Sequence, residues 1–211
     1  GGAGMVKSAY STGKPALGVG PGNTPAYITK DAKIKRAVND LFLSKTFDNG
    51  MICASEQAII VDNEVYNDVK AEFLAHNAYI VSSKAELAKL QAAVMLPDGH
   101  AVNPKIVGFS AKYIAELAGI KVPEETKLLI AEIAGVGVDF PLSREKLSPV
   151  LAMVKANSTE EGLDLCEAML DLGGLGHTAV IHTEDEDLQI QFGIRMKACR
   201  ILVNTPAAEG G

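Results

Sequence analysis

The sequence predicts an α/β fold in which helices cover both faces of a mostly parallel sheet, a three-layer α-β-α sandwich. Apolar runs of strand length alternate along the chain with amphipathic segments of helical period, as in successive β-α-β units. The runs are almost continuously apolar, which is typical of strands buried on both faces. The chain has 211 residues, 47% apolar and 22% charged, with no evident linker, so we expect one domain over residues 1–211.

Seven segments have the length and apolar content of strands. They are 15–20, 26–29, 57–61, 127–133, 148–154, 178–183 and 199–204. The first falls in a Gly- and Pro-rich stretch, 13–25, which is too short for a linker and is interpreted as a structured loop.

Three helices are predicted from apolar residues that recur at helical spacing. Asp31 is placed to cap the first of them, which ends near Phe47. The second follows Asn63, and the third runs from about 185 to 197.

Two further helices begin at capping boxes, in which a Ser accepts the amide of a Glu three residues later. They are 84–95, behind Ser83 and Glu86, and 159–171, behind Ser158 and Glu161. The second is expected to end at the glycine pair Gly173–Gly174, a C-cap signal.

The charge balance and the apolar pattern exclude several classes of protein. The chain has 26 Asp and Glu against 20 Lys and Arg, a formal net charge of −6, whereas a surface that binds nucleic acid is normally basic. No apolar run reaches the ~20 residues of a membrane span, and no basic segment leads into an apolar one as in a signal peptide. We expect a cytoplasmic protein whose partners are neither nucleic acid nor membrane.

The three cysteines, Cys53, Cys166 and Cys199, are odd in number and have no C-x-x-C spacing, which fits a reducing compartment. No spacing of His, Cys or carboxylate residues indicates a metal site. Cys166 shares an apolar helix face with Leu163 and Leu170, and Cys199 begins an apolar strand. Both are interpreted as packing residues.

Cys53 differs from the other two because it follows a turn signal, Asp48-Asn49-Gly50, and precedes the predicted strand 57–61. A thiol there lies where backbone and solvent meet, as a nucleophilic cysteine requires. The residues alone also allow a small buried side chain in a loop.

Two other side chains are candidates for chemistry. His177 follows a glycine cluster and precedes a strand; a neutral imidazole suits a general base, although a His that caps the preceding loop has the same pattern. Glu145 stands before an apolar strand, where a solvated surface carboxylate is the alternative. The glycine clusters at 1–4 and 18–25 allow close approach of another molecule but match neither a P-loop nor a full G-x-G-x-x-G.

Five segments together resemble the aldehyde dehydrogenase superfamily. They are GGAGMVKSAYSTGKPALGVGPGNTP, SKTFDNGMICASEQ, EKLSPVLAM, GGLGHTAVIHT and ILVNTPAAEGG. They are similar in particular to the coenzyme A-acylating acetaldehyde dehydrogenase part of the bifunctional aldehyde–alcohol dehydrogenases, and they cover essentially the whole chain in order. The resemblance implies the catalytic domain of that superfamily.

The resemblance implies a role for each candidate residue. Cys53 matches the catalytic cysteine, which attacks the aldehyde to give a thiohemiacetal; hydride transfer to NAD leaves a thioester, and coenzyme A removes the acyl group as acetyl-CoA. Glu145 matches the Glu that holds the nicotinamide ribose in hydrolytic relatives. His177 matches the histidine of a GHT motif that acts near the thiol of coenzyme A. Gly1 and Gly2 fall where glycines pass the nicotinamide.

Gly18 marks a departure from the hydrolytic relatives, which carry a water-activating Glu in an ELGGK-type motif. The aligned stretch is LGVGPGNTP, with Gly18 in place of that Glu. Loss of this carboxylate fits acyl transfer to a thiol better than hydrolysis. Gly18 is also expected, with Gly1 and Gly2, to lie beside the cofactor.

The resemblance also implies further domains. Family members begin with a dinucleotide-binding Rossmann domain, whose tail residues 1–5 match, and the bifunctional ones continue into an alcohol dehydrogenase domain. Because the chain opens on GGAG without a Met, we expect a fragment, with NAD bound mainly by the missing part. The expected partners are a small aldehyde, coenzyme A, and further copies in a homo-oligomer or filament.

Three alternatives remain open from the sequence. An acylating aldehyde dehydrogenase of another pathway would share Cys53 and His177 but prefer propionaldehyde or longer aldehydes. A non-catalytic filament-assembly module would not need a reactive Cys53. A Cys–His hydrolase would have a nucleophile and a base but no evident orienting partner.

Overall fold

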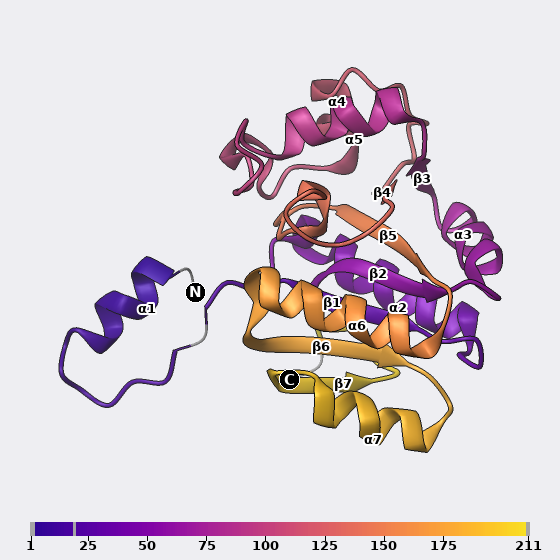
Figure 1. The fold of residues 1–211 in the computed structure, drawn as a ribbon. Helices are drawn as coiled ribbons and strands as arrows, with labels where there is room; N and C mark the ends of the chain where they lie inside the picture. The colour runs from indigo at the N-terminus through magenta and orange to yellow at the C-terminus, as the bar shows by residue number, and fades with distance from the viewer. Residues whose placement is uncertain (1–2, 19, 210–211) are drawn as a thin grey trace.

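The computed structural model describes residues 3–18 and 20–209. Its centre is a seven-stranded sheet in the order β3-β4-β5-β2-β1-β6-β7 (Figure 1). Each pair of neighbouring strands in this sheet is parallel. The strands are β1 (Thr24–Ile28), β2 (Glu56–Asp62), β3 (Ala78–Val81), β4 (Leu128–Glu132), β5 (Val150–Ala156), β6 (Gly176–His182) and β7 (Ala198–Val203). The predicted α/β class and parallel sheet are confirmed.

Helices precede or connect the strands. They are α1 (Ala3–Tyr10), α2 (Ile34–Thr46), α3 (Tyr66–Ala75), α4 (Lys84–Val94), α5 (Ala111–Leu117), α6 (Thr159–Met169) and α7 (Glu186–Arg195). A 3-10 turn, Phe47–Gly50, follows α2, and a π-helical turn, Leu170–Gly174, follows α6. No helix in this part of the chain has the length and apolar character needed to cross a membrane.

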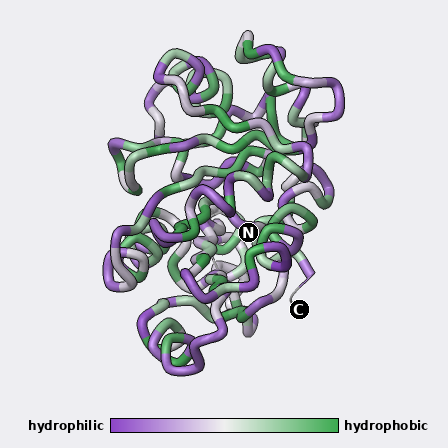
Figure 2. Tube along the Cα trace, turned by 90° about the vertical axis from the view of Figure 1, so that its right-hand side faces the viewer, coloured by the Kyte–Doolittle hydropathy of each residue, from purple (hydrophilic) through white to green (hydrophobic). Residues whose placement is uncertain are grey.

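Alternate residues of a strand face opposite layers of helices. In β1, Ala26 and Ile28 pack in one core with α2 and α3, whereas Tyr27 packs in another with α6 and α7. The helices α4 and α5 lie on the same side as α6, because Val150 and Ala152 of β5 pack with the two groups respectively. This is the expected three-layer sandwich, and Figure 2 shows apolar residues concentrated in its strands.

The strand order explains which face each helix covers. Connections between parallel strands are right-handed, so a reversal in the direction of strand addition moves the helix to the opposite face. The helices α2 and α3 lead toward β3 at one edge, whereas α6 and α7 lead toward β7 at the other. Figure 1 accordingly shows α6 in front of the sheet and α2 behind it.

Two local predictions of helix starts are confirmed. The Ser83 side chain accepts the amide of Glu86, and Ser158 accepts that of Glu161, each at 3.2 Å. These caps satisfy amides that a helix start leaves without intrahelical partners. The start of α6 is therefore determined by residues within its own first turn and does not depend on its packing against the sheet.

The predicted cap of α2 is wrong. The helix begins at Ile34, and Lys33 is the capping position. The carboxylate of Asp31 instead accepts the hydroxyl of Thr183 at 3.0 Å and the amide of Glu184 at 2.7 Å. Asp31 follows β1 and these partners follow β6, so the side chain ties together two neighbouring strand ends.

The strand predicted at 15–20 is also wrong, since residues 15–18 and 20 are irregular. This segment has no neighbour in the sheet and runs back beside α1, where the hydroxyl of Tyr10 accepts the amide of Gly18 at 2.9 Å. Figure 1 shows α1 and the loop after it standing away from the sheet. The helix α1, the four-residue strand β3 and the seven-residue helix α5 are additional to the prediction.

The glycine C-cap predicted after α6 is replaced by the π-helical turn that includes Gly174. A Cβ on Gly174 would lie 2.9 Å from the amide nitrogen of Asn23. Glycine is needed there because the turn passes directly against the chain that enters β1.

Candidate active site

The candidate site lies at the amino ends of the strands. Cys53 precedes β2, Glu145 precedes β5, and His177 is the second residue of β6. Ligands of open parallel sheets usually bind at the carboxyl ends of the strands. The three residues predicted from the sequence lie together at the opposite end of the strands, the amino end.

Cys53 is exposed in a turn between the 3-10 segment and β2. Asp48, Asn49 and Gly50 before it all have left-handed backbone conformations, with φ of 47°, 49° and 68°. Asn, Asp and Gly are the residues that tolerate this region best. The predicted turn signal thus has a structural basis, and it directs the thiol away from the core.

Gly22 joins the Cys53 turn to Glu145. A Cβ on Gly22 would lie 1.9 Å from the carbonyl oxygen of Cys53, so only glycine fits there. The amide of Gly22 donates to Glu145 Oε1 at 3.2 Å. The structure thereby places Cys53 and Glu145 on two sides of one loop.

Buried charges lie beneath this loop. Lys45 and Glu56 are fully buried; burial raises the pKa of Glu56, and it lowers the pKa of Lys45 to about 7 despite the carboxylates of Glu56 and Glu145. Glu145 is half-buried, and desolvation raises its pKa, opposed by the Gly22 amide and Lys45. A carboxyl in this setting is suited to accept a hydrogen bond from a ligand.

His177 lies on the strand beyond β1, with β1 between it and the strand that follows Cys53. Two strand spacings amount to about 10 Å, and among the described residues no hydrogen bond joins Cys53 to His177. Its Nδ1 lies 2.9 Å from Thr178 Oγ1. Burial, followed by the nearby charge of Arg200, lowers the pKa of His177, so the imidazole is neutral near pH 7.

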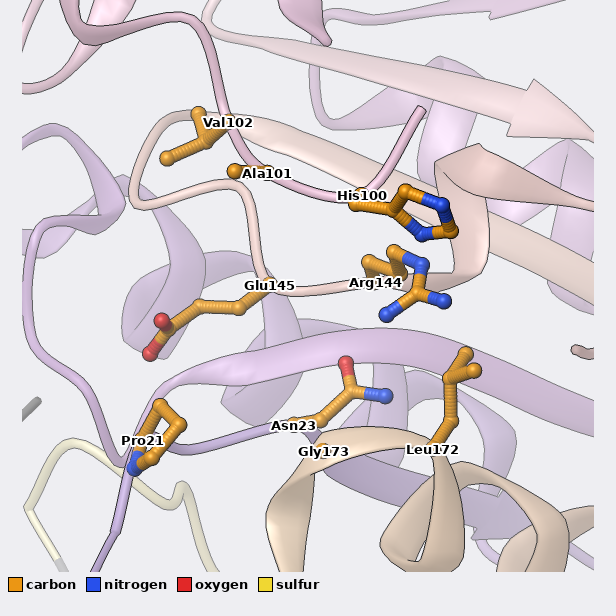
Figure 3. A pocket seen from close by; sticks show the side chains of 9 residues that line it. All are labelled: Pro21, Asn23, His100, Ala101, Val102, Arg144, Glu145, Leu172 and Gly173. Atoms are coloured by element: carbon orange, nitrogen blue, oxygen red, sulfur yellow. The ribbon is translucent and has the colours of Figure 1, made fainter. Parts of the chain in front are cut away.

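A cavity of about 190 Å³ opens beside Glu145 (Figure 3). Its walls are Pro21, Asn23, His100, Ala101, Val102, Arg144, Glu145, Leu172 and Gly173. Asn23 is 2% exposed, its Nδ2 donates to the Met169 carbonyl at 2.9 Å, and its Oδ1 has no partner. Within the described residues, the cavity therefore offers two oxygen acceptors, on Glu145 and Asn23, to a hydroxyl or amide of a ligand.

The remaining predicted residues fall outside this cluster. Gly18 lies in the segment beside α1, where a Cβ would meet the Val6 side chain at 2.9 Å. Gly1 and Gly2 are outside the described residues. Cys166 is fully buried in the core under α6, as predicted, and burial raises its pKa.

The packing role predicted for Cys199 is wrong. Its side chain is exposed on β7 at the edge of the sheet, with Sγ 3.2 Å from the carbonyl oxygen of His177. An apolar sequence around a cysteine does not distinguish a central strand from an edge strand, whose side chains remain accessible. The chain therefore has two exposed thiols.

Sequence reasoning missed the polar residues under the site: Lys45, Glu56, Gln57 and Lys146. All four are fully buried. One signal was available, since Glu56 and Gln57 are polar positions directly before the apolar run 58–61. A buried polar pair at a strand start requires partners, and only the fold shows them.

Across the described residues, no group of three or more His, Cys, Asp or Glu is arranged to hold a metal ion.

The chain is similar to known proteins over its whole length. The model of the aldehyde dehydrogenase family matches residues 2–95. The chain is 50% identical over its full length to the aldehyde-alcohol dehydrogenase 2 of Entamoeba histolytica and 51% identical to the aldehyde-alcohol dehydrogenase of Clostridium acetobutylicum. It covers 25% and 24% of those proteins, so it spans about a quarter of the length of the curated relatives it matches.

Solved structures show the same fold. The chain superposes on an acetylating aldehyde dehydrogenase from Geobacillus thermoglucosidasius with a TM-score of 0.94 and 47% identity, covering 100% of this chain and 46% of that one. A propionaldehyde dehydrogenase from Rhodopseudomonas palustris, with bound CoA and an acylated cysteine, matches with a TM-score of 0.89 and 27% identity over 100% of this chain and 47% of that one.

The fold and the full-length similarity relate this chain to the aldehyde dehydrogenase family. Within that family, it is similar over its full length to one part of the aldehyde-alcohol dehydrogenases and to an acetylating aldehyde dehydrogenase.

Proposed function

We propose that this chain is the cysteine-bearing part of an acetylating aldehyde dehydrogenase that interconverts acetaldehyde, coenzyme A and NAD with acetyl-CoA and NADH. The observation that carries the proposal is the exposed Cys53, held in a left-handed turn against the loop that also binds Glu145. Relatives of about 50% identity are named as aldehyde-alcohol dehydrogenases.

Cys53 is the proposed nucleophile. Its sulfur forms a bond to the carbonyl carbon of the aldehyde as the C=O π bond breaks, and a proton equivalent to that of the thiol is taken up by the oxygen, which gives a thiohemiacetal. Loss of hydride from that carbon and of the hydroxyl proton to solvent leaves an acetyl thioester on Cys53. NAD, when bound, supplies the hydride acceptor. The thiol of coenzyme A then takes the acetyl group, and the bond between the acetyl carbon and Cys53 sulfur breaks.

His177 is the proposed acceptor of the proton from the coenzyme A thiol. Its lowered pKa keeps the ring neutral near pH 7, as a base must be. If Nδ1–H donates to Thr178 Oγ1, Nε2 carries the lone pair that takes the proton. A Cys–His pair of a hydrolase requires the two side chains to lie within hydrogen-bonding distance, whereas β1 lies between the strands of Cys53 and His177. This separation fits different roles for the two residues in the two half-reactions.

Glu145 is the proposed holder of the nicotinamide ribose. Its Oε1 already accepts the Gly22 amide, and the carboxylate lines the cavity together with the unpartnered Oδ1 of Asn23. Acceptor oxygens of this kind fit ribose hydroxyls. We further propose that NAD is held mainly by a dinucleotide-binding domain elsewhere in a longer protein, and that Ala3–Tyr10 is the side of this chain nearest to it.

Gly18 supports transfer to a thiol over hydrolysis. No carboxylate stands at the position where hydrolytic relatives carry their water-activating Glu, and Gly18 packs against α1 instead. Without that base a thioester on Cys53 is lost more slowly to water. Acetyl-CoA is therefore the expected product, and free acetate a minor one.

The test is a pair of variants in the full-length protein that carries this chain, Cys53→Ala and His177→Ala. NADH formation and acetyl-CoA release are assayed separately. We expect Cys53→Ala to abolish both and His177→Ala to reduce mainly acetyl-CoA release. An active Cys53→Ala protein would refute the proposal.

A second candidate is the same chemistry on another aldehyde. The chain is 39% identical to an acetylating succinate-semialdehyde dehydrogenase of Clostridium kluyveri, 46% of which it covers. Comparing kcat/KM for acetaldehyde, propionaldehyde and succinate semialdehyde separates the two, because a preference of more than ten-fold for one of the larger aldehydes, about 1.4 kcal/mol, would favour the second.

A further inference from the structure

Gln57 is a fully buried amide that contacts three separate segments of the site. Its Nε2 donates to the carbonyl of Ser55, two residues after Cys53, at 3.1 Å. Its Oε1 accepts the backbone amide of Lys146, the neighbour of Glu145, at 3.0 Å and Lys45 Nζ at 3.2 Å. One side chain thus links α2, the Cys53 turn and the Glu145 segment.

Lys146 anchors the Glu145 segment from the other side. Its Nζ donates to the carbonyl oxygens of Gln57 at 2.9 Å, Leu142 at 2.8 Å and Arg144 at 2.7 Å. Burial lowers the pKa of Lys146, but three acceptors require three hydrogens, which only the ammonium form supplies. The next residue, Leu147, has a φ of 44°, a strained conformation for a bulky side chain that its surroundings must hold.

These contacts close a ring around the site. Gln57 binds the Lys146 amide, Glu145 next to it accepts the Gly22 amide, and Gly22 lies against the Cys53 carbonyl. From Cys53 the chain leads to Ser55, whose carbonyl returns the ring to Gln57. Cys53 and Glu145 are therefore members of one closed set of contacts.

We propose that Gln57 is a positioning residue that sets the place of Glu145 relative to Cys53, and that Lys146 is its partner in this role. The proposal rests on the function proposed above for Cys53 and Glu145. Burying polar groups gives little net stability over apolar packing. What the amide adds is direction, because its two ends bind the two segments that must be aligned. Gln57 and Lys146 are both fully buried, and neither lines the cavity beside Glu145.

The test uses Gln57→Met in the full-length protein, which keeps the side-chain length and removes both polar ends. We expect KM for NAD to rise about tenfold, the equivalent of one lost hydrogen bond, and kcat to fall. Amide exchange at Gly22 should accelerate by a similar factor, although Gly22 does not touch Gln57, because Glu145 no longer holds it. Unchanged KM and unchanged Gly22 exchange would overturn the proposal.

Gln57→Glu separates the two ends and remains informative if Gln57→Met fails to fold. It keeps Oε1 as the acceptor for the Lys146 amide and for Lys45, and it replaces the donor to the Ser55 carbonyl with an acceptor oxygen that repels that carbonyl. We therefore expect kcat to fall while KM for NAD stays within about twofold of wild type. A KM that rises as much as in Gln57→Met would contradict the assignment of the two ends.

Tyr27→Phe is the matched control for a merely structural loss. It removes a fully buried hydrogen bond, Tyr27 Oη to Asp62 Oδ1 at 2.6 Å, in the strands but away from the Cys53 edge. We expect lower stability with wild-type KM and Gly22 exchange. Equal effects in Tyr27→Phe would show that Gln57 acts through stability alone. If the wild-type protein formed no acetyl-CoA, the proposed function would be refuted. The exchange of the Gly22 amide could still be measured, because it needs no turnover, so the positioning role of Gln57 would be tested separately.

Discussion

Cys53 owes its exposure to the backbone around it more than to its own side chain. Three left-handed residues precede it and Gly22 lies directly against its carbonyl. Each of these conformations is tolerated because the sequence supplies Asp, Asn or Gly where other residues would be strained. The position of the thiol is thus encoded by its neighbours.

Gly22→Ala is expected to reduce acetyl-CoA formation by about 100-fold, because a misplacement of ~1 Å at a reacting group costs about that much. The added Cβ would overlap the Cys53 carbonyl at 1.9 Å, and because this neighbour is backbone it cannot rotate away as a flexible side chain could. The measurement is kcat/KM for acetaldehyde in the full-length protein. Gly20→Ala is the control, since a Cβ there meets no atom within 4 Å; equal losses in the two variants would contradict the account.

The pH dependence of acetyl transfer is expected to follow His177. Burial and the positive charge of Arg200 both disfavour the imidazolium and lower the pKa of His177. Arg200→Gln removes the second cause, so the pKa rises toward its usual value. As the pH falls, the imidazole of the variant is then protonated at a higher pH than that of the wild type. The acidic limb of the rate profile therefore moves to higher pH.

Rates of acetyl-CoA release measured from pH 5 to 9 test this shift. Arg36→Gln serves as the control, because Arg36 lowers the pKa of His182 and not that of His177. A limb that stays in place in Arg200→Gln, or that moves equally in Arg36→Gln, would exclude His177 as the titrating group.

At the scale of elements, the contact between α6 and β1 depends on one glycine. A Cβ on Gly162 would lie 2.4 Å from the Tyr27 ring. Gly162→Ala should therefore lower the free energy of unfolding by about 1–3 kcal/mol through overpacking, measured by urea denaturation. Gly193→Ala in α7, where a Cβ meets nothing within 4 Å, should be neutral or stabilising by about 0.5–1 kcal/mol. A reversed order would show that α6 does not pack this closely.

Elements with local signals were predictable from the sequence. The caps at Ser83 and Ser158 are formed within one turn of helix, so no tertiary information is needed to place them. The strand predicted at 15–20 failed because an apolar segment becomes a strand only with a neighbour to pair with. The strand β3, four residues long at the sheet edge, is too short to show a period.

The candidate site was predictable in part for the same reason. Cys53 follows a recognisable turn signal, whereas Gln57 and Lys146 acquire their roles from contacts across 89 positions of sequence. A buried lysine has no sequence signature, because its three carbonyl acceptors are ordinary backbone. The resemblance of five segments supplied Glu145 and His177, which composition and spacing left open.

At the scale of the whole molecule, the order of the strands in the sheet brings the residues of the site together. The strand β1 lies between β2 and β6, so the residues before β2 and at the start of β6 flank the loop that enters β1. The helix α1 stands outside this body. The chain spans about a quarter of the length of its curated relatives. The proposed reaction is assigned to the longer protein, where we propose that a dinucleotide site lies beside the cavity at Glu145.

The most direct test of the central claim is to identify which cysteine acquires an acetyl group. The full-length protein is incubated with acetyl-CoA without NADH, and peptides are mapped by mass spectrometry. The chain supplies its own comparison, because Cys53 and Cys199 are both exposed and Cys166 is buried. The proposed role of Cys53 predicts an acetyl group on this residue that is removed by added coenzyme A and is absent from the Cys53→Ala protein. Acetylation of Cys199 at an equal level, or none on Cys53, would contradict it.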